Sequence, residues 1–197
     1  CTFGFLGSRY DWFQFEEVKI DGVTFKDVGG KKKSWCGSES KVKPSINISF
    51  DKFNAANKGK AVQAFGTDAL ILNNSLQDPS YIRQCFSYRM FDRAGVPSPL
   101  CNFAHLKVNG KDMGLFVNLQ PLRKPFFKAH WGKNLGNLYE IAGENMEPWA
   151  NERLKAGMDS FKDPEDTSLA DIGKVMNAFS DTGGSIQKIQ NGIDVPA

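Results

Sequence analysis

The chain has 197 residues, of which 41% are hydrophobic and 24% are charged, a composition typical of an ordinary globular protein with one large or two small domains. Its formal net charge of +3 is too small to indicate nucleic acid or a membrane surface as the partner. No apolar stretch approaches the roughly 20 residues that a membrane-spanning helix needs, so we expect no membrane span.

The start of the chain predicts an irregular segment followed by a β-hairpin. Residues 1–17 are rich in aromatic side chains but follow no regular period, so we expect them to be irregular. The stretch VKIDGVTF begins at Val18 and carries Asp21-Gly22 between two short apolar runs, which is a strong signal for a tight hairpin turn.

Two more short strands are predicted before residue 75. In SINISF, Ile46, Ile48 and Phe50 alternate onto one face, as in a half-buried strand. The polar residues 51–66 that follow are expected to form a surface loop, and ALIL, residues 69–72, is typical of a short buried strand.

A helix is predicted after Asp78-Pro79-Ser80. Asp78 or Ser80 can accept a hydrogen bond from an otherwise unpaired backbone N–H, and proline suits the first turn. Gly95 supplies the left-handed residue that ends the helix, and Pro97 prevents it from resuming. Between these signals one apolar stripe recurs at i, i+3, i+4 and i+8, formed by Ile82, Cys85, Phe86 and Met90.

The clearest hairpin surrounds Asn109-Gly110. Apolar residues alternate before this turn, and Met113, Leu115, Val117 and Leu119 alternate after it. Residues 126–140 predict a short helix and a turn. We therefore expect a β-rich portion over residues 18–142 and a helical portion over residues 143–197. This order, with strands first and helices last, indicates an α+β fold.

The four cysteines are Cys1, Cys36, Cys85 and Cys101. None forms a CxxC pair, so the sequence does not favour a zinc site. Four cysteines allow three complete pairings, which sequence alone does not distinguish. Cys85–Cys101 is the pairing that we favour, because one cysteine lies on the predicted helix and the other opens the next strand. Four buried thiols in a cytosolic protein remain the alternative.

A loop rich in glycine, lysine and serine is the first candidate binding site. Gly29-Gly30 would let backbone N–H groups approach an anion, Lys31, Lys32 and Lys33 supply positive charge, and Ser34 adds a hydroxyl donor. Such a loop between strands can cradle phosphates. Its spacing matches neither GxxxxGK[ST] nor GxGxxG, so a solvated turn is the alternative.

Three further residues are candidates for ligand binding. Asn73 and Asn74 follow a strand end, where side chains can face a ligand, although asparagine also suits a plain turn. Arg83 lies in the first helical turn and can bind a carboxylate or phosphate through two hydrogen bonds, unless it is simply a surface residue. His105 and His130 have no partner at ligand spacing, so no metal site is predicted.

Five stretches of the chain, taken in order, are DVGGKKKSWCGSES, KPSINISFDKF, LILNNSLQDPSYIRQCFSYRMFDRAGVPSP, CNFAHLKVNGKDMGLFVNLQPLRKPFF and GNLYE. Together they resemble successive blocks of the CotH kinase family, named after spore coat protein H of Bacillus. The similarity runs from about Val18 to Tyr139, and its most specific blocks are the Asn-Asn, Asp-Pro-Ser, Arg, Gly-Val-Pro series and the Val-Asn-Gly hairpin.

This resemblance implies an atypical protein-kinase-like fold, with an antiparallel sheet, packed helices and a helical C-terminal part. It also implies that ATP with Mg²⁺ or Mn²⁺ is the cofactor and that phosphate is transferred to serines of a coat or surface protein. The expected partners are a protein substrate or a structural protein, and not nucleic acid. The expected location is extracellular, at the cell surface, with the spore coat as one case.

Within the family pattern, the turn of Lys31, Lys33 and Ser34 would face the phosphates, and Arg83 with the asparagine pair would flank the same cleft. The chain departs from that pattern in three places. The run Gly30–Ser34 lacks the Val-Arg that usually precedes Lys-Gly, and Gln120 stands where the family usually has a glutamate. The family's catalytic and metal-binding aspartates lie further along than this chain reaches, so we expect a fragment and assign no catalytic residue. The alternative function is a non-catalytic relative that serves in surface adhesion or assembly.

Overall fold

The computed structural model describes residues 11–34, 38–132, 139–140 and 159–160. The chain divides into two compact units, residues 1–133 and residues 134–197. In the second unit, the described residues form two short antiparallel strands, β7 (Tyr139–Glu140) and β8 (Asp159–Ser160). The remainder of the helical portion predicted over residues 143–197 lies outside the described residues.

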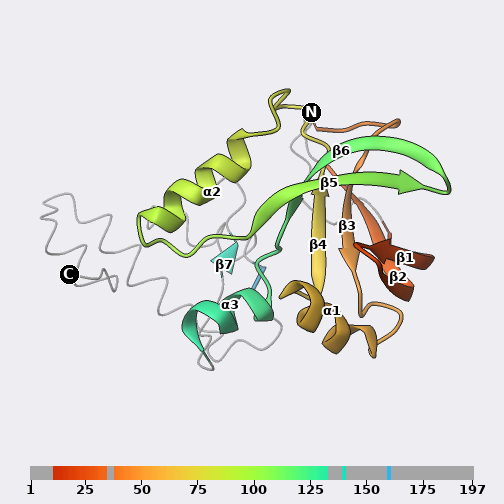
Figure 1. Cartoon of the computed structure of the whole chain (residues 1–197), viewed down its shortest axis with the longest axis horizontal. Helices are drawn as coiled ribbons and strands as arrows, with labels where there is room; N and C mark the ends of the chain where they lie inside the picture. Colours follow the sequence, from red (N-terminus) through yellow and green to blue (C-terminus); the bar gives the residue numbers. More distant parts are fainter. Residues whose placement is uncertain (1–10, 35–37, 133–138, 141–158, 161–197) are drawn as a thin grey trace, which may run out of the picture. The chain divides into compact units, whose positions relative to one another are not determined.

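The first unit contains a six-stranded sheet in which every neighbouring pair is antiparallel. The strand order is β1-β2-β3-β4-β6-β5, and the long β5–β6 hairpin curves over the end of the sheet (Figure 1). The strands are β1 (Phe13–Ile20), β2 (Val23–Lys33), β3 (Ser45–Ser49), β4 (Ala69–Asn73), β5 (Cys101–Val108) and β6 (Lys111–Leu119). With three described helices beside this sheet, the predicted α+β class is confirmed.

The first hairpin confirms the predicted Asp21-Gly22 turn, in which both residues have positive φ, 47° and 85°. β1 begins at Phe13, however, so the prediction that residues 13–17 are irregular was wrong. The aromatic side chains explain the difference. A Cβ added to Gly30 would lie 2.5 Å from the Phe15 ring and 2.6 Å from the Phe13 ring, so these rings pack over the glycine and hold β1 on β2.

The β5–β6 hairpin confirms the Asn109-Gly110 turn but not the simple alternation predicted after it. The register shifts at a bulge between Leu106 and Lys107, and Gly114 has a φ of 76°. Asp112 stabilises this bend, because its carboxylate accepts the Gly114 N–H at 2.7 Å. As a result, Phe116 is fully buried and Met113 packs against the same core cluster. In a regular strand, residues three positions apart would face opposite sides of the sheet.

The prediction of a surface loop over residues 51–66 was wrong, because this region contains the helix α1 (Asn57–Phe65). Its apolar signal is weak, since Asn57 and Ala61 are the residues of α1 that are buried. Asn57 anchors the helix by donating from Nδ2 to the carbonyl oxygens of Lys26, at 2.7 Å, and Phe50, at 3.0 Å. The helix ends at Gly66, which has a φ of 70°.

The predicted helix after Asp78 exists, but α2 (Arg83–Arg93) begins later than expected. Ile82 occupies the N-cap position and makes no side-chain cap bond, but the Asp78 carboxylate accepts the backbone N–H of Arg83, the first helical residue, at 3.0 Å. It also accepts the N–H of Ser80 in the preceding turn at 3.2 Å. Gly95 follows the helix with a φ of 78°. The predicted short helix near residue 126 is α3 (Lys124–Trp131).

The core lies on one face of the sheet, where α1 covers it (Figure 1). Three aromatic rings form its centre. The Phe25 and Phe50 ring centroids are 4.6 Å apart, and Phe65 of α1 lies within 6.0 Å of both. The buried residues of this cluster are Phe25, Val28, Ile46, Ile48, Phe50, Ala61, Leu70, Leu72 and Phe116. Within the described part of the chain, no helix is long and apolar enough to span a membrane.

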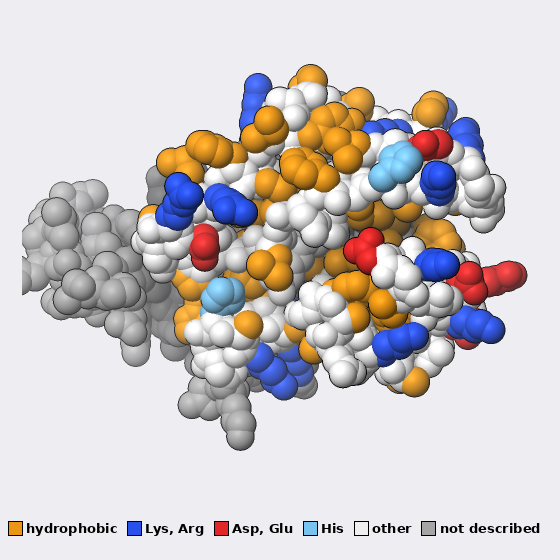
Figure 2. Space-filling view, in the orientation of Figure 1, with side chains coloured by type: hydrophobic (Ala, Val, Ile, Leu, Met, Phe, Trp, Pro, Cys, Tyr) orange, Lys and Arg blue, Asp and Glu red, His pale blue; other side chains and the backbone are white. Residues whose placement is uncertain are grey.

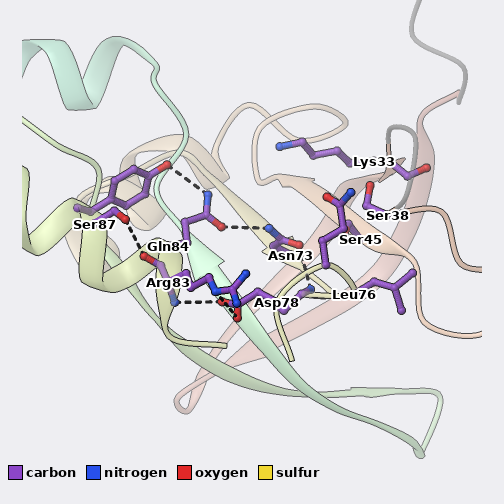
Figure 3. A pocket seen from close by; sticks show the side chains of 13 residues that line it. Lys33, Ser38, Ser45, Asn73, Leu76, Asp78, Arg83, Gln84 and Ser87 are labelled. Carbon is purple, nitrogen blue, oxygen red and sulfur yellow. Dashed lines mark hydrogen bonds and ion pairs between the residues drawn. The ribbon is translucent and has the colours of Figure 1, made fainter. Parts of the chain in front are cut away.

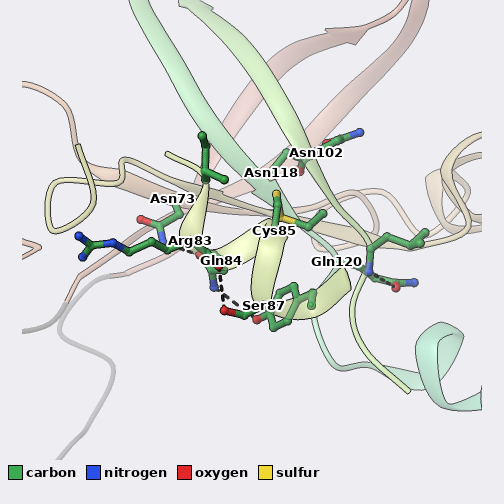
Figure 4. The surroundings of a disulfide bond; sticks show 12 residues. Asn73, Arg83, Gln84, Cys85, Ser87, Asn102, Asn118 and Gln120 are labelled. Carbon is green, nitrogen blue, oxygen red and sulfur yellow. Dashed lines mark hydrogen bonds between the residues drawn. A yellow bond between two sulfur atoms is a disulfide. The ribbon is translucent and has the colours of Figure 1, made fainter. Parts of the chain in front are cut away.

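The favoured disulfide between Cys85 and Cys101 is confirmed (Figure 4). It joins the first turn of α2 to the first residue of β5, with the two Cα atoms 5.2 Å apart. Free thiols at these two positions are therefore excluded. Cys1 and Cys36 lie outside the described residues.

Candidate functional site

A cavity of about 650 Å³, lined mainly by residues with polar side chains, lies between the ends of three sheet strands and helix α2 (Figure 3). It brings together four residues that the sequence suggested for ligand binding: Lys33, Ser34, Asn73 and Arg83. The other lining residues are Ser38, Ser45, Ser75, Leu76, Gln77, Asp78, Gln84, Ser87 and Tyr88.

The sheet side of the cavity is formed where β2 and β4 end and the antiparallel strand β3 begins. Lys33 pairs with Ser45 in the β2–β3 ladder, and partners in a ladder point to the same face. Asn73 is the last residue of β4. The alternation that buries Ile46 and Ile48 in the core therefore turns Ser45 toward the opposite, polar face.

The helix side of the cavity is a polar stripe of α2. Arg83, Gln84, Ser87 and Tyr88 line the cavity, and their i, i+1, i+4 and i+5 spacing places them on one side of the helix. Gln84 links the two sides, because Asn73 donates from Nδ2 to Gln84 Oε1 at 3.0 Å. Gln84 Nε2 in turn donates to the Tyr88 hydroxyl oxygen at 3.3 Å.

The cavity carries two positive side chains and one carboxylate among its described lining residues. Lys33 extends from the sheet side and Arg83 from the helix side (Figure 3). The Arg83 Nε lies 3.6 Å from Asp78 Oδ1. The hydroxyl of Ser80 lowers the pKa of Asp78 below its ordinary value of 3.8, against a smaller opposing effect of burial, and the N–H groups of Arg83 and Ser80 add to the lowering. Asp78 is therefore ionised at neutral pH and orients Arg83.

Two residues fix the loops around the cavity. Asn74 is buried and donates from Nδ2 to the carbonyl oxygens of Ser38, at 3.1 Å, and Lys43, at 2.8 Å. Lys43 Nζ donates to the Tyr81 hydroxyl at 2.9 Å and to the Leu115 carbonyl oxygen at 2.6 Å. The loop before β3 is thereby tied to the segment that leads into α2.

Three of the suggested site residues do not line the cavity. Lys31 lies 5.6 Å from the centroid of the Trp12 ring. Asn74 faces the loop carbonyls described above. Gln120 accepts the Leu100 N–H at 3.2 Å and donates to the Gly66 carbonyl oxygen at 3.5 Å.

Gly29-Gly30 also differs from the expected phosphate-binding loop, because both glycines are strand residues of β2. A Cβ at Gly29 would lie 2.6 Å from Lys52 Cβ and 3.2 Å from the Trp12 ring. Side chains thus occupy the space over both glycines, and their role is to allow close packing of β1 and of Lys52.

The sequence reasoning missed several lining residues that had a readable signal. Ser45 lies opposite the apolar positions of SINISF, and that face is polar throughout the strand. Gln84 and Ser87 accompany Arg83 on the polar side of the predicted helix. Asp78 was considered only as a helix cap, yet it also lines the cavity.

The described residues contain no cluster of three side chains that could hold a metal ion. His105 pairs with Asp112, with 2.8 Å between Nε2 and Oδ1, and both side chains are more than half exposed. His130 packs its ring 4.6 Å from that of Phe126 on α3. Neither histidine lines the cavity.

Comparison with known proteins agrees with the resemblance seen in the sequence. The family model described as CotH kinase protein matches residues 31–197. The inner spore coat protein H-like protein of Bacillus subtilis (strain 168) is 32% identical over 90 residues. That alignment covers 46% of this chain and 26% of the relative's length. Because the family match extends over more than half of the chain, the protein belongs to the CotH kinase family.

Proposed function

We propose that this cavity binds the phosphates of ATP and that the chain is part of a CotH-type protein kinase with an atypical kinase-like fold. The observation that carries the proposal is that Lys33 and Arg83, from distant parts of the sequence, reach one cavity. Their positive charges complement the negative charge of a triphosphate. The proposed reaction is phosphoryl transfer from ATP to serines of a coat or surface protein.

The chemistry of the lining residues suits phosphate oxygens. Charge-assisted hydrogen bonds from arginine and lysine to phosphate are among the stronger polar contacts in proteins. Ser38, Ser45 and Ser87 place hydroxyl groups on the same cavity. Its volume of about 650 Å³ is within the range of roughly 300–1,000 Å³ that is common for small-molecule sites.

The described residues fit the phosphates of ATP but not its metal ion. Asp78 is the carboxylate among the described lining residues, and it is engaged by Arg83 and by the Ser80 hydroxyl. We therefore assign phosphate binding to Lys33 and Arg83 and no metal ligand to this part of the chain. When bound, Mg²⁺ or Mn²⁺ would neutralise phosphate charge during transfer.

The proposed location is the exterior of the cell, with a spore coat as the specific case. The Cys85–Cys101 disulfide favours an oxidising compartment, because structural disulfides are rare in the cytosol. The relative from Bacillus subtilis is named as an inner spore coat protein H-like protein. A protein substrate or structural protein of such a layer is the partner that we propose.

The test is nucleotide binding to the full-length protein, measured by thermal shift with Mg²⁺ or Mn²⁺. ATP at 100 times its Kd should stabilise the protein by about 2.7 kcal/mol. Because hydrogen bonds to charged groups contribute about 1.5–3 kcal/mol, Lys33→Ala and Arg83→Gln should each weaken binding by roughly 10- to 100-fold. Lys111→Ala, at an exposed position of the β5–β6 hairpin, is the matched control.

Equal affinity in all four proteins would refute the assignment of the site. An absence of both ATP stabilisation and phosphate transfer to a serine-rich peptide would refute the kinase function itself.

A second candidate function is non-catalytic adhesion or assembly, and one surface favours it. Large apolar side chains gather over α2 and the neighbouring part of β5 (Figure 2). Exposed apolar patches of this kind mark protein–protein contacts. The exposed residues are Ile82, Phe86, Met90, Phe91, Val96, Leu100 and Phe103. Phosphate transfer by the purified full-length protein would decide against this function.

A further inference from the structure

Helix α2 supplies one wall of the cavity but contributes nothing to the core. None of its residues is buried, and Phe86 and Met90 of its apolar stripe are 60% and 56% exposed. An isolated helix of 11 residues is marginal in water, and most helical stability in proteins comes from a buried apolar face. Other contacts must therefore hold α2 against the sheet.

Three hydrogen bonds join α2 to other segments of the described part of the chain. Asn73 donates to Gln84, Ser98 Oγ donates to the Tyr88 carbonyl oxygen at 2.8 Å, and Asp78 caps the first turn. Each of these bonds competes with water, so each has a small net effect on stability.

The covalent contact is the Cys85–Cys101 disulfide (Figure 4). Cys101 is paired with Leu119 in the sheet ladder, so the bond attaches α2 directly to the sheet. Cys85 lies within three residues of Arg83, Gln84, Ser87 and Tyr88, the residues of α2 that line the cavity. Both cysteines are only partly buried, which leaves them open to attack by a soluble thiol.

We propose that the Cys85–Cys101 disulfide positions the helical wall of the cavity, so that its reduction disables ligand binding while the sheet stays folded. A dithiol reductant attacks one sulfur through its thiolate and forms a mixed disulfide, which its second thiol resolves. The protein gains two electrons and two protons as two cysteine thiols, and the reductant leaves as a cyclic disulfide. The sheet keeps its core, because neither cysteine belongs to the buried cluster.

The loss of ligand binding rests on the proposed function of the cavity, whereas the release of α2 does not. The first measurement is therefore independent of any ligand. Hydrogen exchange is followed in the oxidised protein, the dithiothreitol-reduced protein and the Cys85→Ser/Cys101→Ser variant. Amides of α2 should exchange at least tenfold faster in the reduced protein and in the variant than in the oxidised protein. The exchange rates of β3 and β4 amides should change by no more than about twofold. Unchanged α2 amides, or equal acceleration throughout the sheet, would overturn the proposal.

The second measurement is ATP–Mg²⁺ affinity by calorimetry on the same full-length proteins. Reduction should weaken binding at least tenfold, and reoxidation should restore it. The Cys1→Ser/Cys36→Ser variant is the matched control, and it should keep the response to reductant that Cys85→Ser/Cys101→Ser lacks. If the latter variant does not fold, reduction of the folded wild-type protein gives the same comparison. Full affinity after complete reduction would refute the positioning role, whereas no ATP binding by the oxidised protein would refute the proposed function alone.

Discussion

Asn74 connects two loops beside the cavity, and its removal should be costly although no apolar core is disturbed. Its side chain is buried, donates to the Ser38 and Lys43 carbonyl oxygens and accepts the Leu76 N–H at 3.2 Å. Asn74→Ala leaves these three backbone groups without their partner. At a net 0.5–1.5 kcal/mol for each bond, the loss is roughly 1.5–4.5 kcal/mol, and we expect a value near the middle of that range, about 3 kcal/mol.

Urea unfolding at equilibrium measures this loss as a fall in the midpoint at an unchanged m-value. Asn102→Ala is the matched control, because the Asn102 side chain is exposed and accepts a single bond, from Asn118 at 2.8 Å. Its cost should be about 1 kcal/mol or less. A loss below about 1 kcal/mol for Asn74→Ala, or equal losses in the two variants, would show that Asn74 does not anchor the loops.

Three further outcomes follow from local geometry. Gly30→Ala should destabilise the protein by roughly 1–3 kcal/mol in chemical denaturation, because the new Cβ meets the Phe13 and Phe15 rings. Unchanged stability would show that the two rings move aside at no cost. Gly59→Ala, within α1 and with open space around it, should instead raise stability by about 0.5–1 kcal/mol, and a loss would contradict the helical assignment. The pKa of Asp78 is lowered from 3.8, so its capping contribution is present above the unfolded-state pKa and is lost as the pH falls through the lower folded-state pKa. An NMR titration should therefore show the protection of the Arg83 amide falling with a midpoint below pH 3.8, and a midpoint above that value would contradict the lowered pKa.

The parts of the fold that sequence could predict are those decided by neighbouring residues. The turns at Asp21-Gly22 and Asn109-Gly110 and the helix stop at Gly95 all have the positive φ that glycine adopts without steric cost. α1 was missed because its position depends on tertiary contacts. Asn57 binds carbonyl oxygens of two other segments, and no local pattern encodes them.

The same distinction explains which of the suggested site residues line the cavity. Asn73 and Asn74 are adjacent, and adjacent residues of an extended chain point in opposite directions. Only Asn73 could therefore line the cavity, while Asn74 was free to anchor loops. Lys31 shares a strand face with Lys33 but lies further from the strand end, where the Trp12 ring is within 5.6 Å. The family resemblance predicted that Lys33 and Arg83 flank the same cleft, whereas their spacing in the sequence gives no such relation.

The environment of Lys43 has a practical consequence for chemical footprinting. Its ammonium group lies 5.1 Å from the Tyr81 ring centroid and 4.7 Å from that of Phe116, in addition to its two hydrogen bonds. Acylating reagents must reach the nitrogen atom, and these contacts crowd it on several sides. Lys43 should thus be among the slowest amines to acquire a label, and rapid labelling there would report that the adjoining segments have come apart.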